Sequence, residues 1–98
     1  MVQIYNPNVV GKQVLMDVKN INSDKLKTVE MIRPFMEKII EELKLNVVGE
    51  CTHQFEKNDF PYGVTMIYVL AESHFLSIHT FVDEGKITLD LFTCSLGV

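Results

Sequence analysis

The side chains best suited to chemistry are concentrated in one stretch of the sequence, residues 71–80. It reads Ala-Glu-Ser-His-Phe-Leu-Ser-Ile-His-Thr, with a carboxylate, two hydroxyls and two imidazoles within eight residues. The stretch follows a nearly unbroken apolar segment, where polar side chains are costly to bury unless each finds a partner. We therefore expect either a paired polar cluster or a reactive site.

A thiol and an imidazole of this chain could also form a nucleophilic pair. In thiol hydrolases an imidazole base lowers the pKa of the thiol, and the thiolate attacks a carbonyl carbon. Cys94 and His79 are of the required types. One cysteine and one histidine in a small domain are more often incidental, so the residues alone leave this class open beside a structural role.

Other common kinds of site have no pattern in the sequence. It contains no glycine-rich phosphate loop, paired-cysteine motif or His-Glu-x-x-His segment. His53, His74 and His79 lack a standard ligand spacing, so we expect no metal site. Cys51 alternates with expected core positions, which predicts a small buried side chain. Two cysteines are too few for a disulfide framework, and we expect free thiols.

Length and composition restrict the class of protein. Ninety-eight residues with 47% hydrophobic side chains can bury one core, so we expect a single domain over residues 1–98 with an irregular start at 1–10. The net charge is −4 with both signs interspersed, which argues against a nucleic-acid partner. No targeting pattern or membrane-length apolar run is present, so we expect a soluble, cytoplasmic protein without a membrane partner.

The hydrophobic pattern predicts the elements that would position the reactive stretch. Apolar residues three and four apart predict an amphipathic helix over about 25–44, and Pro34 inside it predicts a kink or a late start. Alternating or apolar segments predict strands on either side of the helix, at 12–19, 46–55, 63–71 and 86–94. A tight turn at 82–85 precedes the last strand. For the strand at 46–55, the alternation predicts that one face is packed.

With the reactive stretch as a further strand, the order is β-α-β-β-β-β. Short turns between strands and a single long helix predict an α+β fold, a two-layer sandwich with a mainly antiparallel sheet. In the last strand the more polar face carries four alternating residues: Thr88, Asp90, Phe92 and Cys94.

Three motifs resemble those of the bacterial and archaeal S-adenosylmethionine decarboxylases. They are Glu-Ser-His at 72–74, Leu-Ser-Ile-His-Thr at 76–80 and Asp-Leu-Phe-Thr-Cys at 90–94. The family signature is Glu-Ser-His-Leu-Ser-Ile-His-Thr, followed after a turn by Asp-x-Phe-Thr-Cys. The likeness covers roughly residues 11–95, and two linked motifs in the right order are a specific signal.

The resemblance implies a proenzyme that cuts itself between Glu72 and Ser73. The Ser73 hydroxyl would attack the Glu72 carbonyl to give an ester, and β-elimination and hydrolysis would leave a pyruvoyl group derived from Ser73. In the family this ketone forms a Schiff base with S-adenosylmethionine and accepts the electron pair left by carbon dioxide. The product is the aminopropyl donor for spermidine and other polyamines.

The resemblance also assigns roles to residues outside the scissile bond. His79 matches the histidine that takes the proton during β-elimination. Thr65 stands where the family usually has a serine that steadies the processing intermediate, and the exchange keeps the hydroxyl. Cys94 matches the thiol that returns a proton to the decarboxylated carbon.

Substrate contacts carry over less completely. Phe55 lies near the aromatic residue that contacts the adenine and sulfonium end of the substrate. The acidic ribose contact becomes Asp83, one methylene shorter, and the adjacent Glu84 could substitute for it. The loop at 56–60 is longer than usual.

One inserted residue affects the reactive stretch. Phe75 separates His74 from Leu76, and an extra residue in a strand turns every later side chain to the other face unless a bulge absorbs it. We therefore predict a β-bulge near His74 and Phe75.

The resemblance leaves several questions open. Family chains continue past the cysteine, so this one is a short member or a C-terminally truncated one. Two alternatives remain: a pyruvoyl-dependent ornithine or arginine decarboxylase of the same family, or a noncatalytic, uncleaved regulatory homologue. Family members work as dimers, so we expect a homodimer.

Overall fold

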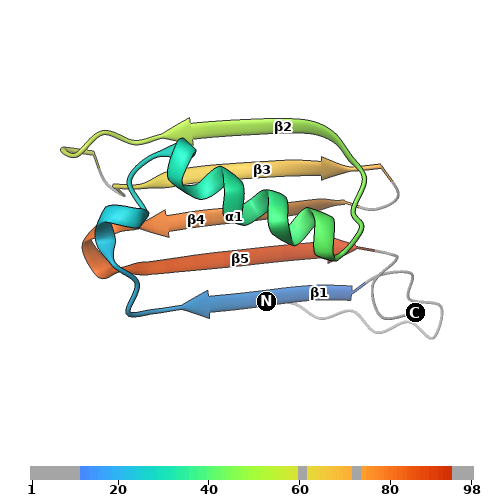
Figure 1. The fold of residues 1–98 in the computed structure, drawn as a ribbon, viewed down its shortest axis with the longest axis horizontal. Helices are drawn as coiled ribbons and strands as arrows, with labels where there is room; N and C mark the ends of the chain where they lie inside the picture. Colours follow the sequence, from blue (N-terminus) through green and yellow to red (C-terminus); the bar gives the residue numbers. More distant parts are fainter. Residues whose placement is uncertain (1–11, 60–61, 72–73, 94–98) are drawn as a thin grey trace.

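The computed structural model of the chain describes residues 12–59, 62–71 and 74–93. Its elements follow in this order: β1 (Lys12–Val18), η1 (Ser23–Lys25), α1 (Val29–Glu42), β2 (Val47–Gln54), β3 (Val64–Leu70), β4 (Phe75–Phe81), η2 (Val82–Glu84) and β5 (Lys86–Thr93). The strands form one antiparallel sheet in the order β1-β5-β4-β3-β2, and α1 crosses one face of it (Figure 1). The predicted α+β two-layer architecture and element order are confirmed.

The helix begins later than its apolar pattern alone predicts, but it does not begin at Pro34, which lies inside α1. Thr28 is the N-cap, and its side chain accepts a hydrogen bond of 3.2 Å from the backbone N–H of Met31. A second side chain, Gln54 of β2, accepts from the N–H of Val29 at 2.9 Å. These caps satisfy N–H groups that lack helical partners, so α1 starts at Val29.

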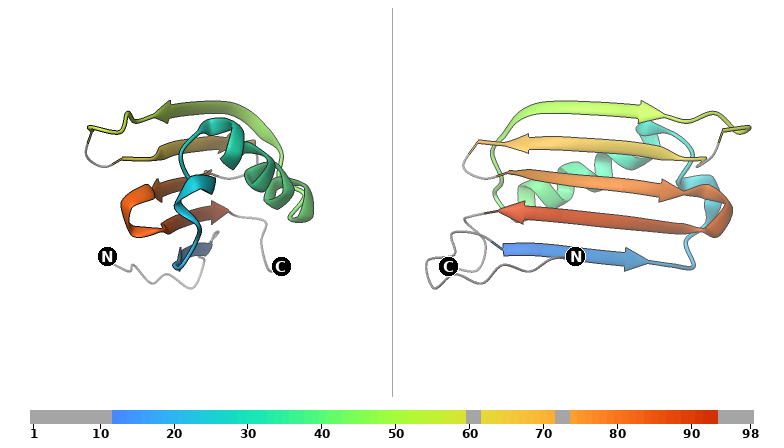
Figure 2. Two further views of the ribbon diagram at one scale, coloured as in Figure 1. Left: turned by 60° about the vertical axis from the view of Figure 1, so that its left-hand side comes forward. Right: turned by 180° about the vertical axis from the view of Figure 1, so that it is seen from behind.

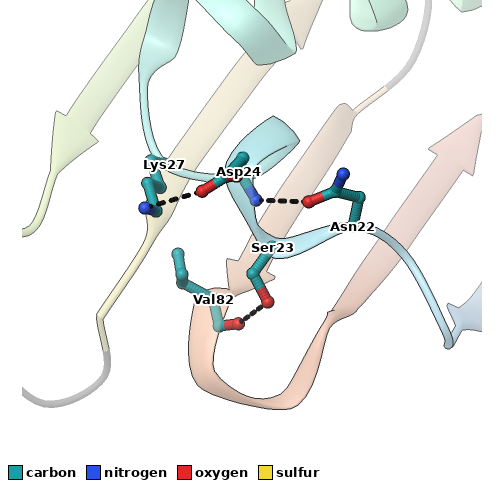
Figure 3. Close-up of polar contacts among 5 residues, drawn as sticks. All are labelled: Asn22, Ser23, Asp24, Lys27 and Val82. Carbon is teal, nitrogen blue, oxygen red and sulfur yellow. Dashed lines mark hydrogen bonds and ion pairs between the residues drawn. The ribbon is translucent and has the colours of Figure 1, made fainter.

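The residues before α1 form a separate short turn that is anchored to the far end of β4. Asn22 accepts a hydrogen bond from the N–H of Asp24 at 3.0 Å, and the hydroxyl of Ser23 donates to the carbonyl of Val82 at 2.6 Å (Figure 3). Lys27 closes the turn through an ion pair with Asp24 at 2.8 Å. The hydrogen bond between Ser23 and Val82 ties η1 to η2, two segments far apart in the sequence.

The core lies between α1 and the face of the sheet that α1 crosses. From the helix it contains Ile32 and Met36, both almost fully buried. From the sheet it contains alternate residues of the three inner strands, namely Val64, Met66, Tyr68 and Leu70 of β3, Leu76 and Ile78 of β4, and Ile87 and Leu91 of β5. The alternation leaves the remaining side chains of these strands on the opposite face.

We call that opposite face the open face, because the described helix lies on the other side of the sheet (Figure 2). Its members alternate with the core residues and are Gln13, Leu15 and Asp17 of β1, Thr88, Asp90 and Phe92 of β5, Phe75, Ser77, His79 and Phe81 of β4, Thr65, Ile67 and Val69 of β3, and Gly49, Cys51 and His53 of β2. The more polar face predicted for the last strand is therefore the open face.

Two expectations about β2 are wrong. Seven of its eight residues are exposed, so neither face is packed as predicted, and Cys51 is exposed rather than buried. The cause is position, because β2 is an edge strand and Cys51 points to the open face. The pairing also shifts between Val47 and Gly49, a bulge that leaves Val48 66% exposed.

The bulge predicted near His74 and Phe75 is consistent with the entry to β4, where the N–H of His74 donates to the carbonyl of Phe92 at 3.3 Å although Phe92 is the register partner of Phe75. Pairing of β4 runs without a shift from Phe75 to His79 with β3 and from Phe75 to Phe81 with β5. The N–H of Leu70 donates to the carbonyl of His74 at 3.1 Å, which places the turn before Phe75. The irregular pairing is thus confined to the entry to β4, and the register from Phe75 onward keeps His79 opposite Thr65.

Candidate active site

The strand registers place five polar residues in one line across the open face. His53 of β2 pairs with Thr65 of β3, Thr65 with His79 of β4, His79 with Thr88 of β5, and Thr88 with Asp17 of β1. Directly opposed residues of antiparallel strands have Cβ atoms about 4.5–5.5 Å apart. We call this line the polar row, and every described strand contributes one member to it.

A hydrogen bond joins two neighbouring members of the polar row, Thr65 and His79. Thr65 Oγ1 lies 3.1 Å from His79 Nδ1. The hydroxyl can donate to Nδ1 or accept from it, according to the tautomer of the imidazole. Either arrangement holds the ring in one orientation. Among the described residues no group hydrogen-bonds Nε2, so that nitrogen is free to exchange a proton with a reacting group.

The start of β4 and the end of β5 meet four positions along the sheet from this pair. Phe75 pairs with Phe92, and the rings of His74 and Phe92 lie 4.3 Å apart between centroids. The N–H of His74 donates to the carbonyl of Phe92 at 3.3 Å. Glu72, Ser73 and Cys94 lie outside the described residues, so their predicted roles stay predictions.

Phe55 lies next to the polar row at the end of β2. Its ring packs edge-on against His53 with 4.5 Å between centroids, and its N–H donates to the carbonyl of Gly63 at 2.8 Å. Phe55 is half-buried. The structure therefore brings this predicted substrate contact close to Thr65, because His53 and Thr65 are directly paired.

Asp83 and Glu84 lie in η2, beyond the end of β4, and both are exposed. The carboxylate of Glu84 is 3.9 Å from Lys86 Nζ, which lies 4.8 Å above the centre of the Phe81 ring. No contact between either carboxylate and Thr65 or His79 is present in the described part of the chain. Their predicted ribose contact stays a prediction.

A search of protein families matches residues 12–98 to the S-adenosylmethionine decarboxylases. The chain belongs to this family. An S-adenosylmethionine decarboxylase proenzyme of Archaeoglobus fulgidus is 34% identical over 86 residues, which make up 88% of this chain and 72% of that one. A proenzyme of the same description from Symbiobacterium thermophilum is 38% identical, over 90% of this chain and 63% of its own length.

The likeness extends to a solved structure of the family. The crystal structure of the adenosylmethionine decarboxylase from Aquifex aeolicus matches with a TM-score of 0.76 at 31% identity, over 90% of this chain and 68% of that chain. The resemblance predicted from three motifs is confirmed. The chain spans less than two thirds of the Symbiobacterium relative and only slightly more of the Aquifex structure.

Besides His53, two residues of the polar row, Asp17 and Thr88, were not among the predicted site residues of this S-adenosylmethionine decarboxylase homologue. Neither belongs to a reactive motif, and Asp17 is 62 positions before His79 in the sequence. The only sequence signal is that each occupies a polar position in an alternating strand. Without the register, nothing connects them to His79.

Two further properties bear on cofactors and membranes. Within residues 12–59, 62–71 and 74–93 there is no group of three or more potential ligands that could hold a metal ion. No helix in the described ranges has the length and apolar character needed to cross a membrane.

Proposed function

We propose that this chain is a pyruvoyl-dependent S-adenosylmethionine decarboxylase proenzyme that supplies the aminopropyl donor for polyamine synthesis. The observation that carries the proposal is the hydrogen bond between Thr65 and His79 on the open face. Family membership supplies the reaction class, and this pair supplies a hydroxyl and an oriented imidazole on the strands that flank residues 72–73. Residues 1–98 are proposed to form one domain, of which residues 12–98 match the family.

Self-processing follows from the residues of this chain. The Ser73 hydroxyl would attack the Glu72 carbonyl, moving the acyl group from nitrogen to oxygen. Thr65 would donate a hydrogen bond to the oxygen that gains charge. His79 would then take the Cα proton of Ser73, so that the Glu72 carboxylate leaves as the double bond forms. Hydrolysis with loss of ammonia would leave a pyruvoyl group.

The residues present fit such a group, because an imidazole and hydroxyls lie on the open face of the sheet to which β4 belongs. The pyruvoyl ketone would bind the substrate amine and accept the electron pair released with carbon dioxide. Cys94 is proposed to return a proton to the product carbon. Phe55 is proposed to meet the cationic sulfonium end with its ring face, and Asp83 or Glu84 the ribose.

Association as a homodimer in the cytoplasm completes the proposal. Three apolar side chains stay uncovered on the open face: Leu15 at 59% exposed, Ile67 at 37% and Val69 at 49%. Ser77 and Asp90 lie between Leu15 and Ile67, and burial of these apolar side chains against a second copy would remove them from water. Sedimentation equilibrium of the purified chain measures the assembly directly.

Intact-mass spectrometry tests the central claim. Wild type should convert into two fragments that part between Glu72 and Ser73, with the C-terminal fragment carrying a pyruvoyl terminus. The Ser73→Ala variant should stay whole. A wild-type chain that keeps its full mass after long incubation would overturn the proposal, and release of carbon dioxide from carboxyl-labelled S-adenosylmethionine by the cleaved protein would then establish the substrate.

A further inference from the structure

The side of the sheet on which α1 lies is wider than one helix can cover. An α-helix is about 10 Å in diameter, whereas the outer strands of a five-stranded sheet lie about 19 Å apart. α1 crosses the sheet obliquely and leaves β1 uncovered on this side (Figure 1). Residues of α1, β1 and the strands between them line a groove with a volume of about 500 Å³. We call it the side groove.

The lining of the side groove is almost entirely aliphatic or aromatic. Leu89 and Leu91 of β5 belong to it, and its charged side chains are one of each sign, Lys38 and Glu42. Four of its apolar side chains remain exposed: Val14 at 41%, Met16 at 50%, Phe35 at 43% and Leu43 at 39%. Apolar surface of this extent is unfavourable in water, so a cover of apolar character would stabilise the fold.

The segment before β1 has the composition of such a cover. Residues 1–10 lie outside the described residues, and none of their side chains is charged. Six of the ten are hydrophobic: Met1, Val2, Ile4, Tyr5, Val9 and Val10. Segments that stay solvated are typically rich in charge and poor in such side chains. Residues 1–10 therefore gain from burial against an apolar surface.

The segment after β5 matches the side groove less well. Residues 94–98 contain two large apolar side chains, Leu96 and Val98, and carry no more than five residues of reach. Cys94, at their start, is predicted to serve the open face, on the other side of the sheet. The N-terminal segment is the better match in both length and composition.

The N-terminal segment is also long enough to reach the side groove. Ile4 is eight residues before Lys12, where β1 begins, and that length of chain extends to at most about 27 Å. Met16 is four residues beyond Lys12, about 13 Å along β1. The difference leaves enough chain for a reversal, and Asn6-Pro7-Asn8 and Gly11 supply residues typical of turns.

We infer that residues 1–5 lie in the side groove, with the side chains of Val2 and Ile4 directed into it. In an extended segment alternate side chains share one side, so Gln3 faces the solvent. The contacts would cover Met16 of β1 and Leu43 of α1. The inference concerns the side of the sheet opposite the polar row, so it does not rest on the proposed function.

Methyl nuclear Overhauser effects test the placement on the whole Ser73→Ala chain, which stays in one covalent state. Effects from the Ile4 methyl groups to both Met16 and Leu43 are expected. Ile4 methyl groups that contact no residue of α1 would overturn the inference, whether the segment is solvated or pairs only with the free edge of β1. In a mixture of labelled and unlabelled chains, effects between different chains would also overturn it, because a second copy would then fill the groove.

Thermal unfolding of the same chain gives an independent readout. Ile4→Ser should lower Tm by about 5 °C, since the benefit of burying one aliphatic side chain is lost. Gln3→Ser is the matched control, because it alters the neighbouring position on the solvent side and should leave Tm unchanged. Equal Tm values for the two variants would overturn the inference.

A double-mutant cycle connects the loss of stability to the side groove. Ile4→Ala and Met16→Ala should each lower Tm. The double variant should lose clearly less than the sum of the two, because side chains in contact share one interaction. Strictly additive losses would show that Ile4 and Met16 do not touch, and would overturn the placement.

Discussion

Thr65 Oγ1 and His79 Nδ1 lie 3.1 Å apart at directly opposed positions of β3 and β4. The pair forms although Phe75 is an additional residue at the start of β4, because the register of β4 is regular from Phe75 onward. His79 therefore keeps the face on which Thr65 lies. The proposed processing chemistry depends on His79 and Thr65 sharing this face more than on any other feature of the chain.

Replacing Thr65 by valine removes the hydroxyl and keeps the β-branched shape. Self-cleavage should slow by about a hundredfold, within the usual range for one acid–base or hydrogen-bonding group. The measurement is the rate at which the full-length mass disappears. Thr65→Ser is the matched control and should cleave at close to the wild-type rate. Wild-type cleavage by Thr65→Val would remove the threonine from the mechanism.

Deleting Phe75 tests whether the register of β4 depends on this additional residue. The shorter turn should still deliver β4 in the same register, so the Thr65–His79 hydrogen bond and self-cleavage should both persist. Imidazole nitrogen shifts of His79 in the Ser73→Ala background report the hydrogen bond. If the deletion instead turned His79 to the helix side, the imidazole shifts would change and cleavage would stop.

The sequence pattern predicted most element boundaries to within a residue or two, because alternation and three-to-four spacing reflect side-chain burial directly. The helix start is a partial exception. The apolar stripe begins at Leu26, yet α1 begins at Val29, since Thr28 caps it and the preceding residues form η1. Local hydrogen bonds decided that boundary.

Periodicity could not reveal which strands lie at the edge or which face lies open. Cys51 alternates with apolar residues as a core residue would, but its strand has only one neighbour, and its side is the open face. For the same reason, periodicity could not show that Asp17 and Thr88 lie in the polar row. Motif resemblance identified His79 and Thr65, whereas the rest of the polar row required the pairing of strands distant in sequence.

Tyr68 offers a test of the core. Its hydroxyl is buried and has no hydrogen-bond partner within the described residues. Tyr68→Phe should raise the free energy of unfolding by about 1 kcal/mol, because an unpaired buried hydroxyl is costly. Urea unfolding at pH 7 measures the change. Thr65→Ser, which leaves this site untouched, serves as the control, and a destabilised Phe variant would contradict the expectation.

The same residue predicts a pH dependence. Burial raises the pKa of Tyr68, because the phenolate is disfavoured away from water. A group whose pKa is higher in the folded chain favours folding below its unfolded value of about 10, and this contribution is lost as the pH rises above it. Wild type should therefore lose stability above about pH 10 more steeply than Tyr68→Phe. Parallel unfolding curves from pH 8 to 11 would contradict this.

Thr80 joins the sheet to the segment before the helix. Its Oγ1 accepts from the N–H of Val64 and donates to the carbonyl of Leu26, both at 2.8 Å, and the residue is 3% exposed. Thr80→Val would leave both backbone groups buried and unpaired, which should cost about 2–4 kcal/mol. Thermal unfolding measures the loss. Thr80→Ser retains both hydrogen bonds and should lose much less; equal losses would show that the methyl group, not the hydroxyl, matters.

Cys94→Ala separates processing from turnover. Since the thiol is proposed to act only after the pyruvoyl group has formed, this variant should still split between Glu72 and Ser73 while kcat for carbon dioxide release falls by about a hundredfold. Intact mass measures the first and labelled carbon dioxide the second. His79→Ala is the opposite case, because loss of the imidazole should stop splitting itself. If Cys94→Ala cleaved and turned over like wild type, another group would have to protonate the product carbon, and His74, whose ring lies against Phe92, would be the next to test.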